Sequence, residues 1–134
     1  MLLGSSLLAI EAGTSNGASV ARTDESSRCH VLPHVDLIIT HGGNNTTTEA
    51  FHFGKPMILL PLFWDQYDNA QRVHELGFGQ RLDTYGFADE ELIGAVDRLL
   101  ADDELHARMA ANATVIQGRS GTALAADLIE GLAR

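Results

Sequence analysis

The chain has 134 residues, of which 45% are hydrophobic and 20% are charged, values typical of one globular domain. Nine Lys and Arg face eighteen Asp and Glu, which gives a formal net charge of -9. This balance argues against nucleic acid or an anionic membrane as a partner, because phosphate surfaces require a basic face. A small phosphate-bearing ligand stays compatible with it, since backbone N–H groups bind anions even on an acidic protein.

Cys29 is the only cysteine, which excludes a disulfide within the chain and favours a reducing, cytoplasmic setting. No apolar run approaches the roughly 20 residues that a membrane-spanning helix needs. The opening residues, MLLGSSLLAI, lack the basic group that precedes the apolar part of a signal peptide. We therefore predict neither a signal peptide nor a membrane span.

Residues 1–30 carry little pattern. After Ile10 the chain is rich in Gly, Ser, Thr and Ala and shows neither helical nor strand periodicity, which is typical of a linker or a disordered segment. We predict such a segment over residues 1–30, with a weakly docked helix or strand at its start, and a folded domain over residues 31–134.

From residue 31 onward the pattern indicates alternating strands and helices. Three short apolar runs have the composition of buried strands: residues 35–40, 57–60 and 79–82. Helices are predicted between and after them, over residues 46–53, 65–76, 92–100, 102–117 and 122–134. This alternation predicts βαβ units, and therefore an α/β fold with a Rossmann-like parallel sheet and flanking helices.

Polar residues gather where the first two strands end. The turn HGGNN follows the first strand, and Gly42 and Gly43 allow the backbone to approach a ligand closely. Asn45 and Thr46 offer polar donors at a helix start, which is a common site for a phosphate. The second strand is followed by Asp65 and Gln66. Carboxyl ends of neighbouring parallel strands face one crevice, so both groups are predicted to meet one ligand.

The run HGGNNTTTEAFHFGKPMILLPLFWDQYDNA resembles the signature of family 1 glycosyltransferases, which include plant, mammalian and macrolide-modifying UDP-sugar transferases. The shared positions are His41, Gly43, Glu49, Gly54, Pro56, Pro61, Asp65, Gln66, Asn69 and Ala70. The resemblance implies the C-terminal, donor-binding half of a two-domain GT-B enzyme. It also implies transfer of a hexose from a UDP-sugar to a small acceptor, with inversion and without a metal or other cofactor.

The resemblance also implies roles for individual residues. His41 is expected to contact the diphosphate, with Gly43 beside it and Asn45 and Thr46 as further phosphate donors. Glu49 is expected to bind the ribose hydroxyls, because its two oxygens suit a vicinal diol. Asp65 and Gln66 are expected to read the hydroxyls of the transferred sugar.

Two of these residues have structural alternatives. Thr46 and Glu49 are spaced as a capping box, in which Glu49 would only close a helix. Asp65 is placed to be the N-cap of the next helix. A metal site at His41 is not expected, because no second ligand stands at a suitable spacing, and His30 and His34 precede a strand.

No general base for an acceptor hydroxyl is visible in the sequence, so no catalytic residue is assigned. Two alternatives to a working transferase domain therefore stay open. The first is a donor-binding subunit that needs a separate acceptor-domain partner, and the second is a truncated, non-catalytic fragment.

Overall fold

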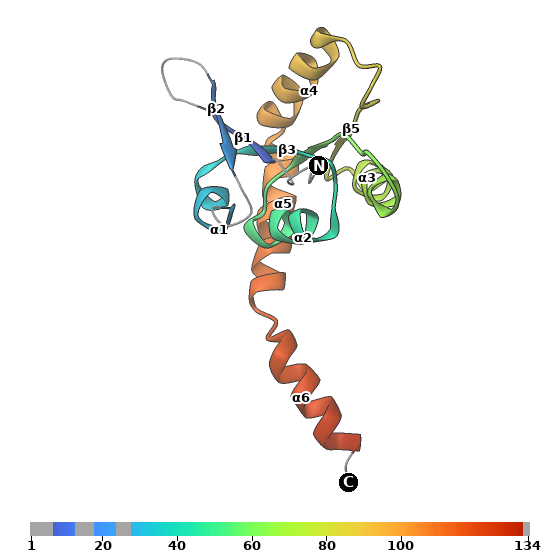
Figure 1. The fold of residues 1–134 in the computed structure, drawn as a ribbon. Coiled ribbons are helices and arrows are strands. Elements are labelled where there is room, and N and C mark those ends of the chain that lie inside the picture. Colours follow the sequence, from blue (N-terminus) through green and yellow to red (C-terminus); the bar gives the residue numbers. More distant parts are fainter. Residues whose placement is uncertain (1–6, 13–17, 24–27, 133–134) are drawn as a thin grey trace.

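The computed structural model of the protein describes residues 7–12, 18–23 and 28–132. These residues form a five-stranded sheet with helices on both faces and a last helix that projects from the body (Figure 1). The strands are β1 (Leu7–Ala12), β2 (Ala18–Thr23), β3 (Leu37–Thr40), β4 (Met57–Leu59) and β5 (Gly79–Arg81). The helices are α1 (Arg28–Val31), the 3-10 turn η1 (Leu32–His34), α2 (Asn44–Phe53), α3 (Asp65–Glu75), α4 (Asp89–Ala101), α5 (Asp103–Gln117) and α6 (Gly121–Leu132).

The strands follow the order β2-β1-β3-β4-β5 across the sheet. β3, β4 and β5 are parallel, with Ile39 opposite Ile58 and Ile58 opposite Gln80. α2 connects β3 to β4 and α3 connects β4 to β5, so the predicted βαβ units and the Rossmann-like α/β fold are confirmed. Because these three strands run in one direction, their carboxyl ends lie at the same edge of the sheet.

The sheet is buried on both faces. One face is covered by α2 and α3 and holds this cluster of buried residues: Leu32, Val35, Ile38, Ala50, Met57, Leu59, Ala70 and Val73. The other face is covered by α4 and α5 and holds a second cluster: Leu37, Ile39, Ile58, Leu82, Ala95, Leu99, Leu105 and Met109. Neighbouring strand residues point to opposite faces, so a strand covered on both sides is continuously apolar, as in Leu37–Ile39 of β3 and MIL of β4.

The described N-terminal residues form two strands, whereas we predicted a linker over residues 1–30 with a weakly docked helix or strand only at its start. β1 pairs antiparallel with β2, from Leu7 opposite Thr23 to Ala12 opposite Ala18, and also pairs antiparallel with β3. Main-chain hydrogen bonds to an existing sheet can hold a strand whose own sequence has little periodicity. The same expectation for residues 1–6, 13–17 and 24–27 lies outside the described residues and stays a prediction.

Helix α2 begins two residues earlier than predicted. Its first residue is Asn44, not Thr46, and Gly43 is its N-cap, with φ -64° and ψ 152°. The backbone of Gly43 is extended, so Asn44 and Asn45 already belong to the first turn. The sequence alone missed this start because the cap is a glycine, whereas Ser, Thr, Asp and Asn are the usual signals.

The last three helices follow the predicted order. The carboxylate of Asp102 accepts a hydrogen bond from the N–H of Leu105 (2.9 Å) and caps α5, which confirms the predicted start of a helix at residue 102. α6 extends away from the sheet (Figure 1), and none of its described residues is buried. Throughout the described ranges, every helix is too short or too polar to cross a membrane.

Candidate functional site

The turn after β3 (residues 41–43, the β3 turn) brings the backbone against two other elements. Gly42 has a φ of +84°, which side chains rarely adopt, and its N–H donates to Oγ1 of Thr40 (3.3 Å). A Cβ atom on Gly42 would lie 3.1 Å from Cδ2 of Leu59 and 3.5 Å from the main-chain oxygen of Gln66. The end of β3 therefore lies directly against β4 and the first turn of α3.

Gly43 is needed for a different reason. Its φ of -64° is ordinary, but a Cβ atom at this position would lie 2.6 Å from Nε2 of His41. The imidazole therefore lies over the backbone of Gly43, at the N-terminus of α2. Since no described side chain caps α2, main-chain N–H groups and an imidazole stand together at one helix end, an arrangement suited to an anion.

The two predicted phosphate donors of α2 differ in exposure. Asn45 is exposed in the first turn, whereas Thr46 is only 3% exposed and lies in the interior. Of the two, only Asn45 presents its side chain to solvent. The two-residue error in the predicted helix start is the reason that the sequence did not distinguish them.

Glu49 lies in the second turn of α2, half-buried, with its Oε2 atom shielded from solvent. The capping-box alternative for Glu49 is wrong. It required Thr46 to precede the helix, but the N-cap is Gly43 and Thr46 lies within the first turn. The carboxylate of Glu49 is therefore not explained by helix capping.

Asp65 and Gln66 open α3 and are placed differently. Asp65 is exposed and is the first helical residue; the N-cap position belongs to Trp64, so the N-cap alternative for Asp65 is wrong. Gln66 is 5% exposed, and its Oε1 accepts hydrogen bonds from the N–H groups of Leu62 (2.9 Å) and Phe63 (3.3 Å). Gln66 therefore fixes residues 62–64, the β4 loop, onto α3.

The β4 loop presents aromatic side chains to solvent. Trp64 is 84% exposed, and its ring meets Phe63 edge to face with centroids 5.4 Å apart. Trp64 has φ 51° and ψ -131°, a conformation that residues other than glycine seldom adopt. Backbone conformations of this kind cost about 1–3 kcal/mol and persist only where the surroundings hold them. The buried amide of Gln66 supplies such a hold.

Asn69, one turn further along α3, joins the two strand ends. Its Nδ2 group donates to the main-chain oxygen of Gly42 (3.0 Å) and to Oδ1 of Asn44 (2.9 Å). The β3 turn, the start of α2 and the start of α3 are thus held as one unit. Sequence reasoning placed Asn69 in the signature but assigned it no role, because its partners lie 27 and 25 residues away along the chain.

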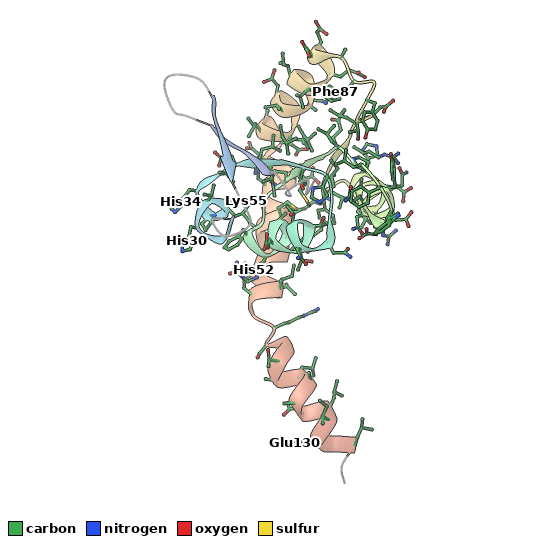
Figure 2. All side chains as sticks on the ribbon, viewed as in Figure 1. His30, His34, His52, Lys55, Phe87 and Glu130 are labelled. Carbon is green, nitrogen blue, oxygen red and sulfur yellow. The ribbon has the colours of Figure 1, made fainter. Side chains whose placement is uncertain are left out.

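The remaining histidines that the sequence singled out lie elsewhere. His30 lies in α1 and His34 is the last residue of η1, on the side of the molecule where Lys55 precedes β4 (Figure 2). They precede β3 whereas His41 follows it, so they belong to the opposite edge of the parallel sheet. Within the described ranges, no group of three or more His, Cys, Asp or Glu side chains is arranged to hold a metal ion.

Proteins of similar fold and sequence indicate which class this arrangement belongs to. The glycosyltransferase of kitacinnamycin superposes with a TM-score of 0.72 at 34% identity, over 77% of this chain and 27% of that chain. The glycosyltransferase VinC, solved in complex with dTDP, gives a TM-score of 0.62 at 25% identity, over 67% of this chain and 23% of that one. Demethyllactenocin mycarosyltransferase of Streptomyces fradiae is 37% identical over 102 residues, 76% of this chain and 22% of that protein.

The fold and these matches define the class: the C-terminal, Rossmann-like half of a GT-B glycosyltransferase. Residues 17–131 match the family described as erythromycin biosynthesis protein CIII-like, C-terminal domain, and the chain belongs to this family. It spans about a quarter of the length of the relatives that it matches.

Proposed function

We propose that this chain binds a UDP-hexose where β3 and β4 end, as the donor half of an inverting, metal-independent transferase for a small acceptor. One observation carries the proposal: the amide of Asn69 bonds both Gly42 and Asn44. This contact holds the helix start suited to phosphate next to the first turn of α3, where Asp65 and Gln66 lie. One extended ligand with an anionic and a hydroxylated end fits such a pair of neighbouring groups.

The diphosphate end is assigned to the β3 turn. His41 and the N-terminus of α2, with Gly43 and Asn45, would face the negative charge that grows on the diphosphate as the sugar leaves. Thr46 would contribute through its position in the first turn and not through its buried hydroxyl. Preformed donors of this kind stabilise a leaving group because they need no reorientation during the reaction.

The ribose and sugar ends are assigned to Glu49 and to the start of α3. Glu49 would accept hydrogen bonds from ribose hydroxyls; its Oε2 is shielded, so binding a diol across both oxygens requires the covering residues to shift. Asp65 is exposed and would accept from the sugar hydroxyls. The Oε1 atom of Gln66 is engaged by the β4 loop, so its contact with the sugar would use the Nε2 donor.

The binding site for the sugar acceptor, and the general base that would deprotonate its hydroxyl, are not part of the function proposed for this chain. The relatives are about four times as long as the matched region, and we propose that an acceptor-binding domain or subunit supplies both. Donor binding is therefore the part of the function that this chain can be tested for directly.

Calorimetry with UDP tests the proposal. We expect the chain to bind UDP with a Kd below about 1 mM, and His41→Ala to weaken binding about tenfold or more, as the loss of a hydrogen bond to a charged group does. The matched control is His34→Ala, an exposed histidine at the opposite edge of the sheet. No binding of UDP at millimolar concentration, or equal weakening by both substitutions, would contradict the proposal.

A second arm of the same titration tests the ribose contact. UDP has a 2′-hydroxyl that dTDP lacks, so Glu49→Gln should weaken UDP more than dTDP. Glu90→Gln, an exposed change of the same charge at the start of α4, should affect neither nucleotide. If Glu49→Gln weakens both nucleotides equally, the carboxylate does not read the ribose.

A further inference from the structure

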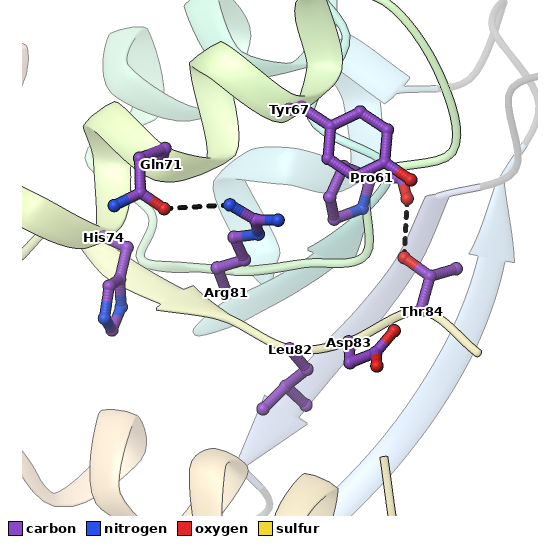
Figure 3. Close-up of a pocket in the computed structure, with 8 residues that line it drawn as sticks. All are labelled: Pro61, Tyr67, Gln71, His74, Arg81, Leu82, Asp83 and Thr84. Carbon is purple, nitrogen blue, oxygen red and sulfur yellow. Dashed lines mark hydrogen bonds between the residues drawn. The ribbon is translucent and has the colours of Figure 1, made fainter. Parts of the chain in front are cut away.

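A hollow lies at the carboxyl end of β5. Its volume is about 510 Å³, within the usual range for small-molecule sites of about 300–1,000 Å³. Tyr67 and Gln71 of α3 form one wall, Arg81 stands at the end of β5, and Asp83 and Thr84 follow on the next segment (Figure 3). We call it the β5 pocket; of the ten signature positions, it includes only Pro61.

Arg81 is held in place by neutral partners. Its Nη1 group donates to Oε1 of Gln71 (2.8 Å), and its guanidinium carbon lies 5.4 Å from the centre of the Tyr67 ring. Tyr67 and Gln71 are one helical turn apart on α3, so a single helix face positions the guanidinium. Both contacts place the guanidinium at the wall of the pocket, and a positioned group of this kind lowers the entropy cost of binding.

The guanidinium has no carboxylate partner in the described part of this acidic chain. Among the described residues, neither Nε nor Nη2 of Arg81 has a hydrogen-bond acceptor, although the chain carries a net charge of -9. These two N–H groups form the side edge of the guanidinium, which matches the two oxygens of a carboxylate. A half-buried, oriented arginine without a counter-ion, at the wall of a cavity, points to an anionic ligand.

The segment after β5 offers hydrogen-bond acceptors on the side chains of Asp83 and Thr84. The hydroxyl of Thr84 donates to the main-chain oxygen of Pro61 (2.6 Å), so its oxygen can only accept from a ligand in this geometry. Oδ1 of Asp83 accepts the N–H of Tyr85 (3.2 Å), and the carboxylate keeps further acceptor capacity. A ligand that places an anion on Arg81 would therefore place hydroxyl donors toward Asp83 and Thr84.

We propose that the β5 pocket binds a small carboxylate that carries hydroxyl groups, with the carboxylate on the Nε–Nη2 edge of Arg81 and the hydroxyls on Asp83 and Thr84. The site depends on contacts of α3, β5 and the segment after it. It does not depend on nucleotide binding at the β3 turn, so each proposal can fail without the other.

The test is a titration of the full chain, followed by ¹H–¹⁵N NMR without nucleotide, with four probes: gluconate, its neutral analogue sorbitol, acetate and inorganic phosphate. Gluconate should shift the Nε–H signal of Arg81 and the amides of residues 82–86, with a Kd on the order of 1 mM. Acetate should bind more weakly, and sorbitol should not bind. Equal binding of sorbitol, tighter binding of phosphate, or no shift with gluconate would overturn the proposal.

Substitutions distinguish binding at the Nε–Nη2 edge of Arg81 from a general effect of positive charge on affinity. Arg81→Gln should weaken gluconate about tenfold, and Arg81→Lys should weaken it as well, because an ammonium group lacks the two-pronged edge. Arg72→Gln, an exposed arginine of α3 outside the pocket lining, should leave the affinity unchanged. If Arg72→Gln weakens gluconate as much as Arg81→Gln does, the effect is general charge and the proposal is wrong. Should Arg81→Gln lower the melting temperature, the NMR shifts of the unmodified chain and the Arg81→Lys variant still decide the question.

Discussion

At the scale of single residues, the imidazole ring of His41 lies over Gly43 and leaves little room for a side chain there. A Cβ atom would come within 2.6 Å of Nε2 of His41, but the obstacle is the end of a side chain that can rotate away. We therefore predict that Gly43→Ala changes the free energy of unfolding by less than about 1 kcal/mol. Because the substitution displaces the imidazole of His41, the affinity for UDP should fall about tenfold, as it does when a hydrogen bond to a charged group is lost. Chemical denaturation and calorimetry measure the two effects.

Gly42→Ala is the matched comparison. Its positive φ and its closeness to Leu59 strain any side chain, so this variant should lose on the order of 1–3 kcal/mol of stability. If Gly43→Ala proves as destabilising as Gly42→Ala, or binds UDP normally, the placement of His41 over the helix start is contradicted.

At the scale of elements, the β4 loop depends on one buried amide. Gln66→Leu removes the acceptor of the N–H groups of Leu62 and Phe63, which should cost about 1–3 kcal/mol. It should also free Trp64, the only tryptophan of the chain, so that the steady-state anisotropy of its fluorescence falls. Denaturation curves and anisotropy on the same samples check both expectations.

Gln66→Glu is the informative control for this loop. A carboxylate still accepts both N–H groups, and a negative charge is favourable in the first turn of a helix, so the anisotropy of Trp64 should stay close to that of the unmodified chain. An equal fall of anisotropy in both variants would show that the loop is not held through the Oε1 atom.

The spacing of apolar residues, together with Gly and Pro at the ends of segments, predicted most helices and strands correctly because apolar spacing follows burial. LIIT and MILL are apolar on both faces, and Gly54 ends α2 with a left-handed backbone, so the order of strands and helices from residue 35 onward followed from the sequence. The start of α2 did not, since its cap is a glycine. The hairpin of β1 and β2 did not either, since the pairing of β1 with β2 and with β3 depends on main-chain hydrogen bonds and leaves little pattern in the sequence.

The signature proposes a set of site residues, but it does not predict the contacts that these residues make. The signature gave His41, Glu49 and Gln66 by resemblance, whereas their burial and partners depend on packing between elements. Fixed spacing cannot show that Gln66 holds the β4 loop, or that Asn69 reaches back to the β3 turn. The β5 pocket was missed because Gln71 and Arg81 belong to no motif and meet only when α3 packs on β5.

At the scale of the whole molecule, α6 contributes an apolar stripe but no core. Leu124, Leu128 and Leu132 are all more than half exposed and recur every four residues, so they share one side of the helix. We predict that Leu124→Ser combined with Leu128→Ser changes the melting temperature by less than about 2 °C. The same variant should bind less of the dye ANS, which reports exposed apolar surface. Melting curves and dye fluorescence measure the two outcomes.

Leu105→Ser in α5 is the counterpart, because Leu105 is buried in the cluster beneath α4 and α5. Its loss should cost about 3 kcal/mol, as for other large buried side chains. A melting temperature that falls as far in the α6 variant as in Leu105→Ser would mean that α6 packs on the body in solution.

The amide of Asn69 has a further consequence for how the chain reaches its working state. Its two hydrogen bonds span 27 and 25 residues, so a half-formed chain that contains only the first strand–helix unit has no completed crevice. The contacts that join the β3 turn to α2 and α3 therefore require α3 to be docked, and a nucleotide bound at the proposed donor site would stabilise the folded chain by mass action. Donor binding at the proposed site and the docking of α3 would then depend on the same carboxamide.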